Sequence, residues 1–147
     1  MTVKETEYGD LTGGVYPSQM SLEKKGLTSL EGSPKRVIRG YYIGRNKLTD
    51  LKFSPEYVGA QFSVYANKTL VSLEGGPKEV GDDFFCTECP KLKNPIEQII
   101  QYQIKARYYY TDEGKFPFSD IETRFVNYVL DKRVKRTSMR TLLGLDK

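Results

Sequence analysis

Histidine and tryptophan are absent from this 147-residue sequence, which contains only two cysteines. Without histidine there is no Ser-His or Cys-His catalysis, no histidine-ligated metal and no acid–base chemistry by imidazole. Long apolar runs are also missing, because no stretch approaches the roughly 20 consecutive apolar residues of a transmembrane helix. The first residues lack the pattern of a signal peptide. We therefore expect a soluble, unprocessed protein that is not an enzyme, needs no cofactor or metal, and does not bind a membrane.

Glycine is distributed unevenly along the chain. Eleven of the 13 glycines precede residue 95, so the turn-forming composition ends near Asn94-Pro95. The length, with 38% hydrophobic and 29% charged residues, is typical of one compact domain or of a domain with a small cap. We expect a boundary in the chain at this dipeptide.

A block of the form Leu-x-x-Leu, followed by a proline and then a valine, occurs three times before that boundary. The blocks begin at Leu27, Leu48 and Leu70, which are 21 and 22 residues apart. A second pattern precedes each block and recurs after the third: two apolar residues at alternate positions, then Asn, Cys or Lys three residues on. Its copies are Met20, Leu22 and Lys25; Tyr41, Ile43 and Asn46; Phe62, Val64 and Asn67; and Phe84, Cys86 and Cys89. This spacing is the signature of a leucine-rich repeat.

Each part of the repeat has a physical role. The two alternating apolar residues predict a short strand with one face inward. The Asn or Cys then turns the chain, with its side chain bonded to backbone groups that the bend leaves unpaired. The leucines and the valine form the far wall of the coil. Pro34, Pro55 and Pro77 lie at one corner of each coil. Proline fixes the φ angle there, and its missing N–H is tolerated because this position needs no backbone donor.

Residues 20–94 resemble the short leucine-rich-repeat-like proteins of tailed bacteriophages. The segment that matches their repeat motif best is Leu70-Val-Ser-Leu-Glu-Gly-Gly-Pro77. The resemblance implies an interaction scaffold and supplies no catalytic residue. We expect a phage protein in the host cytoplasm that binds and inhibits or redirects a host protein, an antiviral defence component among the candidates. The alternative is a structural component of the virion or of its assembly.

The residues after the boundary predict two helices. Asn94 and Pro95 open the first, whose stripe Ile96, Ile99, Ile100 and Ile104 continues to about Tyr108. The second begins at Ser119 in a capping box, with Phe118 stapled to its first turns and a buried face made by Ile121, Phe125, Tyr128, Val129 and Val134. The expected fold is α+β, a small leucine-rich-repeat-like β-solenoid of about four coils: an N-terminal arm or cover (1–19), the solenoid (20–94) and a helical C-terminal cap (95–147).

The outward strand positions are the candidate binding surface. They place three aromatic side chains on one face, with two hydroxyl residues between them: Tyr42, Tyr65 and Phe85, then Ser63 and Thr87. Exposed aromatic clusters are typical anchors of protein interfaces, so we expect a host or phage protein to bind here. The other interpretations are that tyrosine merely favours strands, or that the C-terminal helices cover this face.

A basic run near the C-terminus is a second candidate site. It consists of Lys132, Arg133, Lys135, Arg136 and Arg140. These residues suit contact with phosphates of nucleic acid or with an acidic partner. Because the net charge is only +4, we favour the alternative that they are solvated charges near the end of a helix. The apolar Leu142–Leu145 tail either packs on the fold or docks elsewhere, and the oligomeric state stays open.

The Cys86-Thr-Glu-Cys89 motif has the spacing of half a zinc site or of a redox pair. A zinc site needs four ligands, and the sequence has no second such motif and no histidine to complete it. The repeat places Cys86 at an inward strand position and Cys89 at the position of Asn46 and Asn67. We therefore expect two buried, reduced thiols with a structural role, as suits a cytosolic protein.

Overall fold

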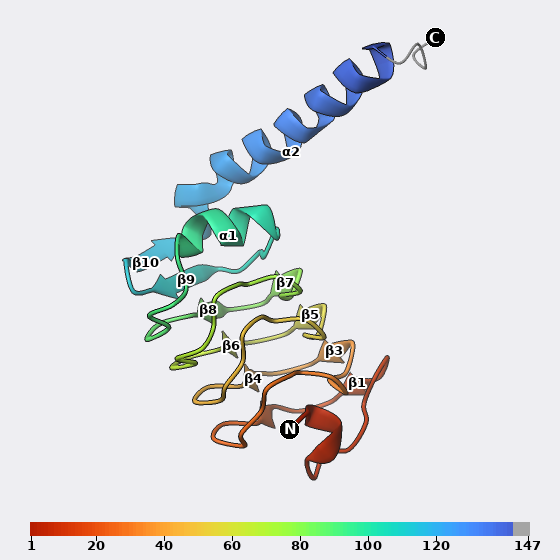
Figure 1. Ribbon diagram of the computed structural model, residues 1–147, viewed down its shortest axis with the longest axis vertical. Coiled ribbons are helices and arrows are strands. Elements are labelled where there is room, and N and C mark those ends of the chain that lie inside the picture. The colour runs from red at the N-terminus through yellow and green to blue at the C-terminus, as the bar shows by residue number, and fades with distance from the viewer. Residues whose placement is uncertain (143–147) are drawn as a thin grey trace.

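The computed structural model describes the backbone of residues 1–142 and the side chains of residues 1–133. The chain winds into a β-solenoid of about 5 turns, followed by a C-terminal helix (Figure 1). The elements in chain order are η1 (Val3–Glu5), β1 (Val15–Tyr16), β2 (Met20–Ser21), β3 (Arg36–Val37), β4 (Tyr41–Tyr42), β5 (Tyr57–Val58), β6 (Phe62–Ser63), β7 (Glu79–Val80), β8 (Asp83–Phe85), α1 (Pro95–Gln101), β9 (Tyr108–Thr111), β10 (Gly114–Pro117) and α2 (Phe118–Leu142).

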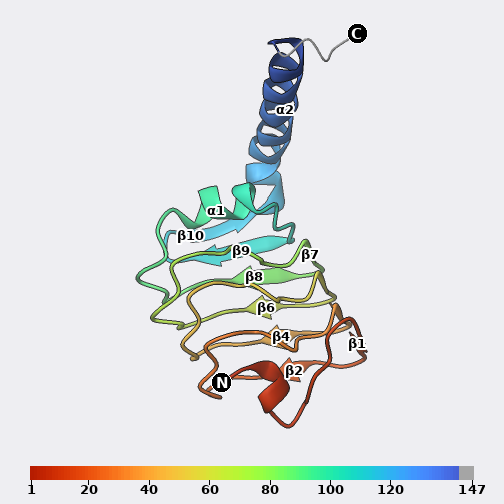
Figure 2. The same cartoon turned by 45° about the vertical axis from the view of Figure 1, so that its right-hand side comes forward.

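Successive turns of the solenoid stack their strands into two sheets. The smaller sheet has the order β1-β3-β5-β7 and is parallel throughout. The larger sheet has the order β10-β9-β8-β6-β4-β2 and is parallel except for the β9–β10 hairpin (Figure 2). The expected α+β solenoid is confirmed. It has about five turns rather than four, because strands at both ends of the chain lengthen the stack predicted from residues 20–94.

The repeat positions that the sequence turns inward form the core. All eight are at most 1% exposed: Met20, Leu22, Tyr41, Ile43, Phe62, Val64, Phe84 and Cys86. Inside the larger sheet, aromatic rings stack from turn to turn. Ring centroids are 5.5 Å apart between Tyr41 and Phe62 and 5.3 Å apart between Phe62 and Phe84. The leucine blocks and the valines of the smaller sheet close the opposite wall, as predicted.

The turns that follow β4 and β6 are each held by a buried asparagine, Asn46 and Asn67, whereas Lys25 at the corresponding position of the first turn is exposed. Asn46 Nδ2 donates to the carbonyls of Leu22 and Ile43, both at 2.9 Å, while Asn46 Oδ1 accepts from the amide of Leu27 at 3.0 Å. Each asparagine therefore links its own turn to the preceding turn. The predicted role of these asparagines is confirmed, since they satisfy backbone groups that the bend leaves without strand partners.

The first C-terminal helix is shorter than predicted. It ends at Gln101, and the expectation that it continues to about Tyr108 is wrong. Gln103 adopts a left-handed φ of 54°, and the Lys105 amide then donates to the carbonyl of Lys78, so the chain returns to the solenoid. Ile104 is buried as expected, although it belongs to the next turn of the solenoid.

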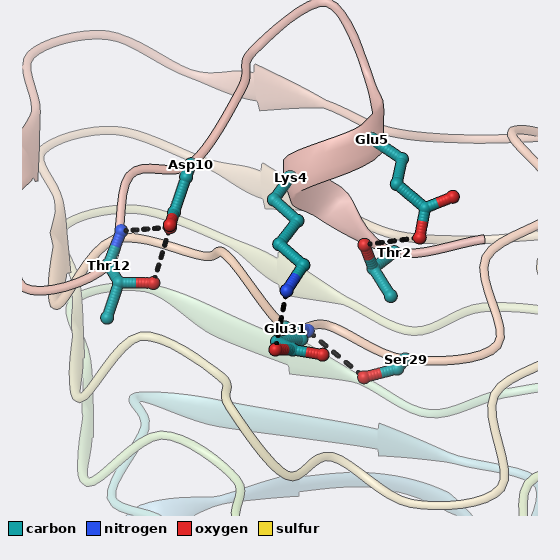
Figure 3. Close-up of polar contacts among 7 residues, drawn as sticks. All are labelled: Thr2, Lys4, Glu5, Asp10, Thr12, Ser29 and Glu31. Carbon is teal, nitrogen blue, oxygen red and sulfur yellow. Dashed lines mark hydrogen bonds and ion pairs between the residues drawn. The ribbon is translucent and has the colours of Figure 1, made fainter.

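Residues 1–19 cover the first turn of the solenoid. Lys4 lies over the corner at Glu31, where its amide donates to the Glu31 carbonyl and its Nζ lies 2.8 Å from Glu31 Oε1 (Figure 3). At the edge of the larger sheet, the Tyr8 hydroxyl accepts a hydrogen bond from the Ser21 amide at 3.0 Å. The cover thus occupies a backbone donor that would otherwise be free to pair with another strand.

Candidate protein-binding surface

The outward side of the larger sheet, here called the outer face, carries one row of side chains in strict register. From the N-terminal to the C-terminal end the row is Ser21, Tyr42, Ser63, Phe85, Tyr110 and Lys115. Neighbours in the row are one strand spacing apart, about 4.8 Å. The four central side chains are half-buried, and the two at the ends are exposed.

The C-terminal part of the outer face forms an aromatic cluster, consisting of Phe85, Tyr108, Tyr110 and Lys115. The rings of Phe85 and Tyr110 stack with centroids 4.3 Å apart and an interplanar angle of 10°. Lys115 Nζ lies 4.5 Å from the ring centroid of Tyr108 and 5.2 Å from that of Tyr110. A hydrogen bond to Tyr110 raises the pKa of Lys115, whose side chain is exposed. The cluster therefore combines apolar ring area with a fixed positive charge.

The other predicted aromatic residues lie on the same face, further along the sheet. Ser63 stands between Tyr42 and Phe85 in the row, which separates those two side chains by about 10 Å. The Tyr42 ring lies over Gly40, where an added Cβ would come within 2.5 Å of the ring. Tyr42 therefore lies flat along the strand direction rather than pointing toward Phe85.

Tyr65 and Thr87 form the next row of the outer face, just beyond the ends of the strands. Both are half-buried, and the Ala66 amide beside Tyr65 donates to the Thr87 carbonyl at 3.0 Å. The guanidinium carbon of Arg45 lies 5.6 Å from the Tyr65 ring centroid. The five residues predicted from the sequence thus share one face, and Phe85 is the member that joins a stacked aromatic cluster.

Sequence reasoning missed Tyr108, Tyr110 and Lys115, because it assigned Tyr108 to a helix. Two signals in the sequence favoured strands here. Tyr108-Tyr-Tyr-Thr111 consists of residues with high β-propensity, and the turn residues Asp112-Glu-Gly114 follow directly. Of the three consecutive tyrosines, Tyr109 is fully buried, and Tyr108 and Tyr110 are half-buried on the outer face.

The C-terminal helices leave the outer face uncovered. Helix α2 packs on the end of the solenoid through Ile121 and Phe125, which are 3% and 5% exposed. The Phe118 ring contacts that of Phe125 at 5.4 Å between centroids. The helix begins at Phe118, so the prediction of a capping box that starts at Ser119 is wrong, and Phe118 lies in the first turn rather than before it. Beyond this contact the helix extends away from both sheets (Figures 1 and 2). The interpretation in which these helices fold back over the strands is therefore excluded.

The basic run lies in α2, on the part that extends from the body. Lys132 and Arg133 are exposed, and Lys132 Nζ lies 4.6 Å from the Tyr128 ring centroid. The side chains of Lys135, Arg136 and Arg140 lie outside the described residues, as does the predicted buried contact of Val134. The tail prediction for Leu142–Leu145 also falls outside them.

The two cysteines are buried, free thiols at the positions that the repeat predicts. Cys89 Sγ lies 3.5 Å from the carbonyl oxygens of Val64 and Thr87, in the position that asparagine occupies in earlier turns. Burial raises the pKa of both thiols, and that of Cys89 to about 11. Within residues 1–133, no three Cys, Asp or Glu side chains are arranged to hold a metal ion.

Between about pH 9 and pH 11 we expect the free energy of unfolding to fall in a way that depends on Cys89. The folded protein keeps the thiol proton up to about pH 11, whereas the unfolded chain releases it from about pH 9, so rising pH favours the unfolded state. Urea unfolding at pH values below and within this window measures the effect. The variant Cys89→Asn should show a smaller fall, and an equal fall in both proteins would contradict the assignment.

Comparisons with protein-family models, curated proteins and solved structures find no match to this chain. Among the described residues, no helix has the length and apolar character needed to cross a membrane.

Proposed function

We propose that this chain is a non-catalytic protein-binding module whose partner docks on the outer face. The stacked pair of Phe85 and Tyr110 beside Lys115 carries the proposal. Aromatic side chains are common anchors in protein interfaces, and a rigid sheet presents them with little loss of conformational entropy on binding. Strands pair on both sides of β8 and β9, which fixes the backbone beneath Phe85 and Tyr110.

The repeat resemblance supports a more specific role. We propose a bacteriophage protein, similar to the short leucine-rich-repeat-like proteins, that acts in the host cytoplasm by binding a host protein and inhibiting or redirecting it. A component of antiviral defence is one target class. In the competing proposal, the same surface makes fixed contacts with other proteins of the virion or of its assembly intermediates.

A nucleic-acid partner is the second candidate function, supported by the exposed Lys132 and Arg133 on the extended part of α2. Phosphate contacts make binding strongly dependent on salt, because each contact releases counterions. Affinity for a nucleic acid that fell steeply between low and physiological salt would support this function, whereas a flat response would exclude it.

Affinity capture with paired variants tests the outer face. The face variant carries Tyr42→Ser, Phe85→Ser and Tyr110→Ser. The control variant carries Val15→Ser and Tyr57→Ser, which change the outward side of the smaller sheet. Each tagged protein is expressed in phage-infected cells and purified after nuclease treatment, and the bound proteins are identified by mass spectrometry.

We expect a specific protein to bind the wild type and the control variant and to be absent from the face variant, with at least about a tenfold loss of affinity for the purified partner. Circular dichroism must show that the face variant is folded. Equal binding by all three proteins would overturn the proposal. A captured host protein supports the host-directed role, and incorporation into purified particles supports the virion role.

A further inference from the structure

We propose that the side of the solenoid where the chain turns after each inner strand binds the phosphate backbone of nucleic acid. This side, here called the turn edge, consists of the turns that follow β2, β4, β6 and β8, residues 23–26, 44–47, 65–68 and 87–90 (Figure 1). Five exposed cations form a patch on its first three turns: Lys24, Lys25, Arg45, Lys47 and Lys68. The proposal goes beyond the outer face and does not rest on α2.

The turn edge holds equivalent residues of successive turns next to one another. The Lys24 amide donates to the Gly44 carbonyl at 3.2 Å, and Lys24 and Arg45 share a left-handed φ, of 54° and 55°. Neighbouring turns are one strand spacing apart, about 4.8 Å. Lys24 therefore lies beside Arg45. The same register places Lys47 beside Lys68, since each follows the buried asparagine of its turn.

At two other corners of the solenoid, charges of opposite sign follow one another from turn to turn. The corner after the leucine block carries Lys4, Glu31, Lys52 and Glu74 in order, and the corner after the prolines carries Lys35, Glu56 and Lys78. Three neighbouring pairs form ion pairs at N–O distances of 2.8, 3.9 and 4.0 Å, and Figure 3 shows the first of them, between Lys4 and Glu31. Like charges on adjacent strands are destabilising, yet the turn edge places cations side by side. A bound polyanion would neutralise them.

Carboxylates of the protein neutralise only part of this patch. Among residues 1–133, Lys25 is the member of the patch that forms an ion pair, with its Nζ 3.5 Å from Glu7 Oε1. Glu23 is the other acidic residue in the first turn, and it is exposed. The patch ends at the fourth turn, where Glu88 takes the position equivalent to Lys24 and Arg45. Five cations thus lie near two acidic residues over the first three turns, which leaves the patch with a net positive charge.

The composition and size of the patch favour a phosphate backbone over an acidic protein. Four of its five cations are lysines, and lysine is depleted in protein interfaces, whereas stripes of lysine and arginine are typical of nucleic-acid-binding surfaces. The patch crosses three turns, about 10 Å, and the phosphates of one strand are about 3.4 Å apart along the axis. It therefore spans about three phosphates. Such contacts carry no information about base sequence, so we expect binding without sequence preference.

Fluorescence anisotropy of labelled DNA with the full chain, between about 50 and 200 mM salt, tests the proposal. The probes are a single strand and a duplex, each about 20 nucleotides long and of mixed sequence. The edge variant carries Arg45→Gln, Lys47→Gln and Lys68→Gln. The control variant carries Lys35→Gln, Lys52→Gln and Lys78→Gln, which are exposed lysines of the other two corners, so both variants have the same net charge.

We expect the wild type and the control variant to bind at least one probe, and the edge variant to bind it at least about tenfold more weakly at low salt. The slope of log affinity against log salt should become shallower by about 3, or about 1 for each cation removed, so Lys68→Gln alone should change it by about 1. Removing neighbouring like charges relieves repulsion. The edge variant should therefore unfold at no lower temperature than the wild type, and its loss of binding does not reflect loss of the fold.

Three results would refute the proposal: a wild type that binds neither DNA probe, an edge variant that binds as tightly as the wild type, or binding of polyglutamate in place of DNA. The last result would assign the patch to an acidic protein. A third variant, Lys132→Gln with Arg133→Gln, separates the patch from α2 and should bind as the wild type does. Loss of binding by this variant alone would assign the phosphate contacts to α2 instead.

Discussion

Replacing Asn67 with leucine is expected to lower the free energy of unfolding by about 3–4 kcal/mol. The side chain is fully buried, and its Nδ2 donates to the carbonyls of Ile43 and Val64 at 3.0 and 2.9 Å. Its Oδ1 accepts from the Leu48 amide at 3.2 Å. Leucine has a similar volume and offers none of these bonds, so a buried amide loses its partner and two carbonyls lose a donor. Urea unfolding measures the loss.

The matched variant is Asn67→Cys, because the chain itself places Cys89 in the same position one turn later, with Sγ 3.5 Å from two carbonyls. It keeps a weak donor toward the same carbonyls and should lose less stability than the leucine variant. If the leucine variant loses no more than about 1 kcal/mol, the average for single substitutions, the buried asparagine does not hold the turn.

The two adjacent phenylalanines of β8 are expected to differ sharply when each is replaced by alanine. Phe84 is fully buried, stacks on Phe62 at a centroid distance of 5.3 Å and packs against the tilted ring of Tyr109 at 6.4 Å. Phe84→Ala should therefore lower the free energy of unfolding by about 3–5 kcal/mol. Phe85 lies on the outer face and loses mainly its stack on Tyr110, so Phe85→Ala should cost about 1 kcal/mol.

Thermal or urea unfolding of both variants measures the contrast. A Phe85→Ala variant as unstable as Phe84→Ala would mean that the aromatic cluster supports the fold, and loss of binding by a Phe85 variant would then have a structural cause. A small effect leaves Phe85 free to serve as a binding anchor. The two variants thus distinguish the buried aromatic side chains that stabilise the core from the outer-face aromatic side chains that are proposed to bind a partner.

Much of the fold follows from the sequence because each turn repeats one physical requirement. The positions of Tyr41 and Phe62 must face inward, and those of Asn46 and Asn67 must satisfy a bend, so their spacing alone predicts strand, turn and wall. The outward row then follows from the alternation of side chains along a strand. This logic located Tyr42 and Phe85 correctly on the outer face.

The repeat spacing does not predict the fold after Asn94, where the sequence no longer shows the pattern. The stripe of Ile99, Ile100 and Ile104 fits a helix, yet Ile104 is buried by the turn that carries β9. Strand β9 forms because β8 offers a parallel partner, pairing Phe85 with Tyr110. That pairing links residues distant in sequence, which local periodicity does not register. The strand propensity of residues 108–111 predicts a strand here, but not that it pairs with β8, and the aromatic cluster depends on that pairing.

A solenoid can gain or lose whole turns without a change in how its interior packs. Each turn packs on its neighbours, so the interior of the solenoid does not define how many turns there are. The N-terminal cover at Lys4 and Glu31 and the α1–α2 end close the stack and so set its length. In-frame duplication of one repeat of 21 or 22 residues would widen the outer face by one strand, about 4.8 Å. Recombination between repeats is thus a route to new partners that leaves both ends intact.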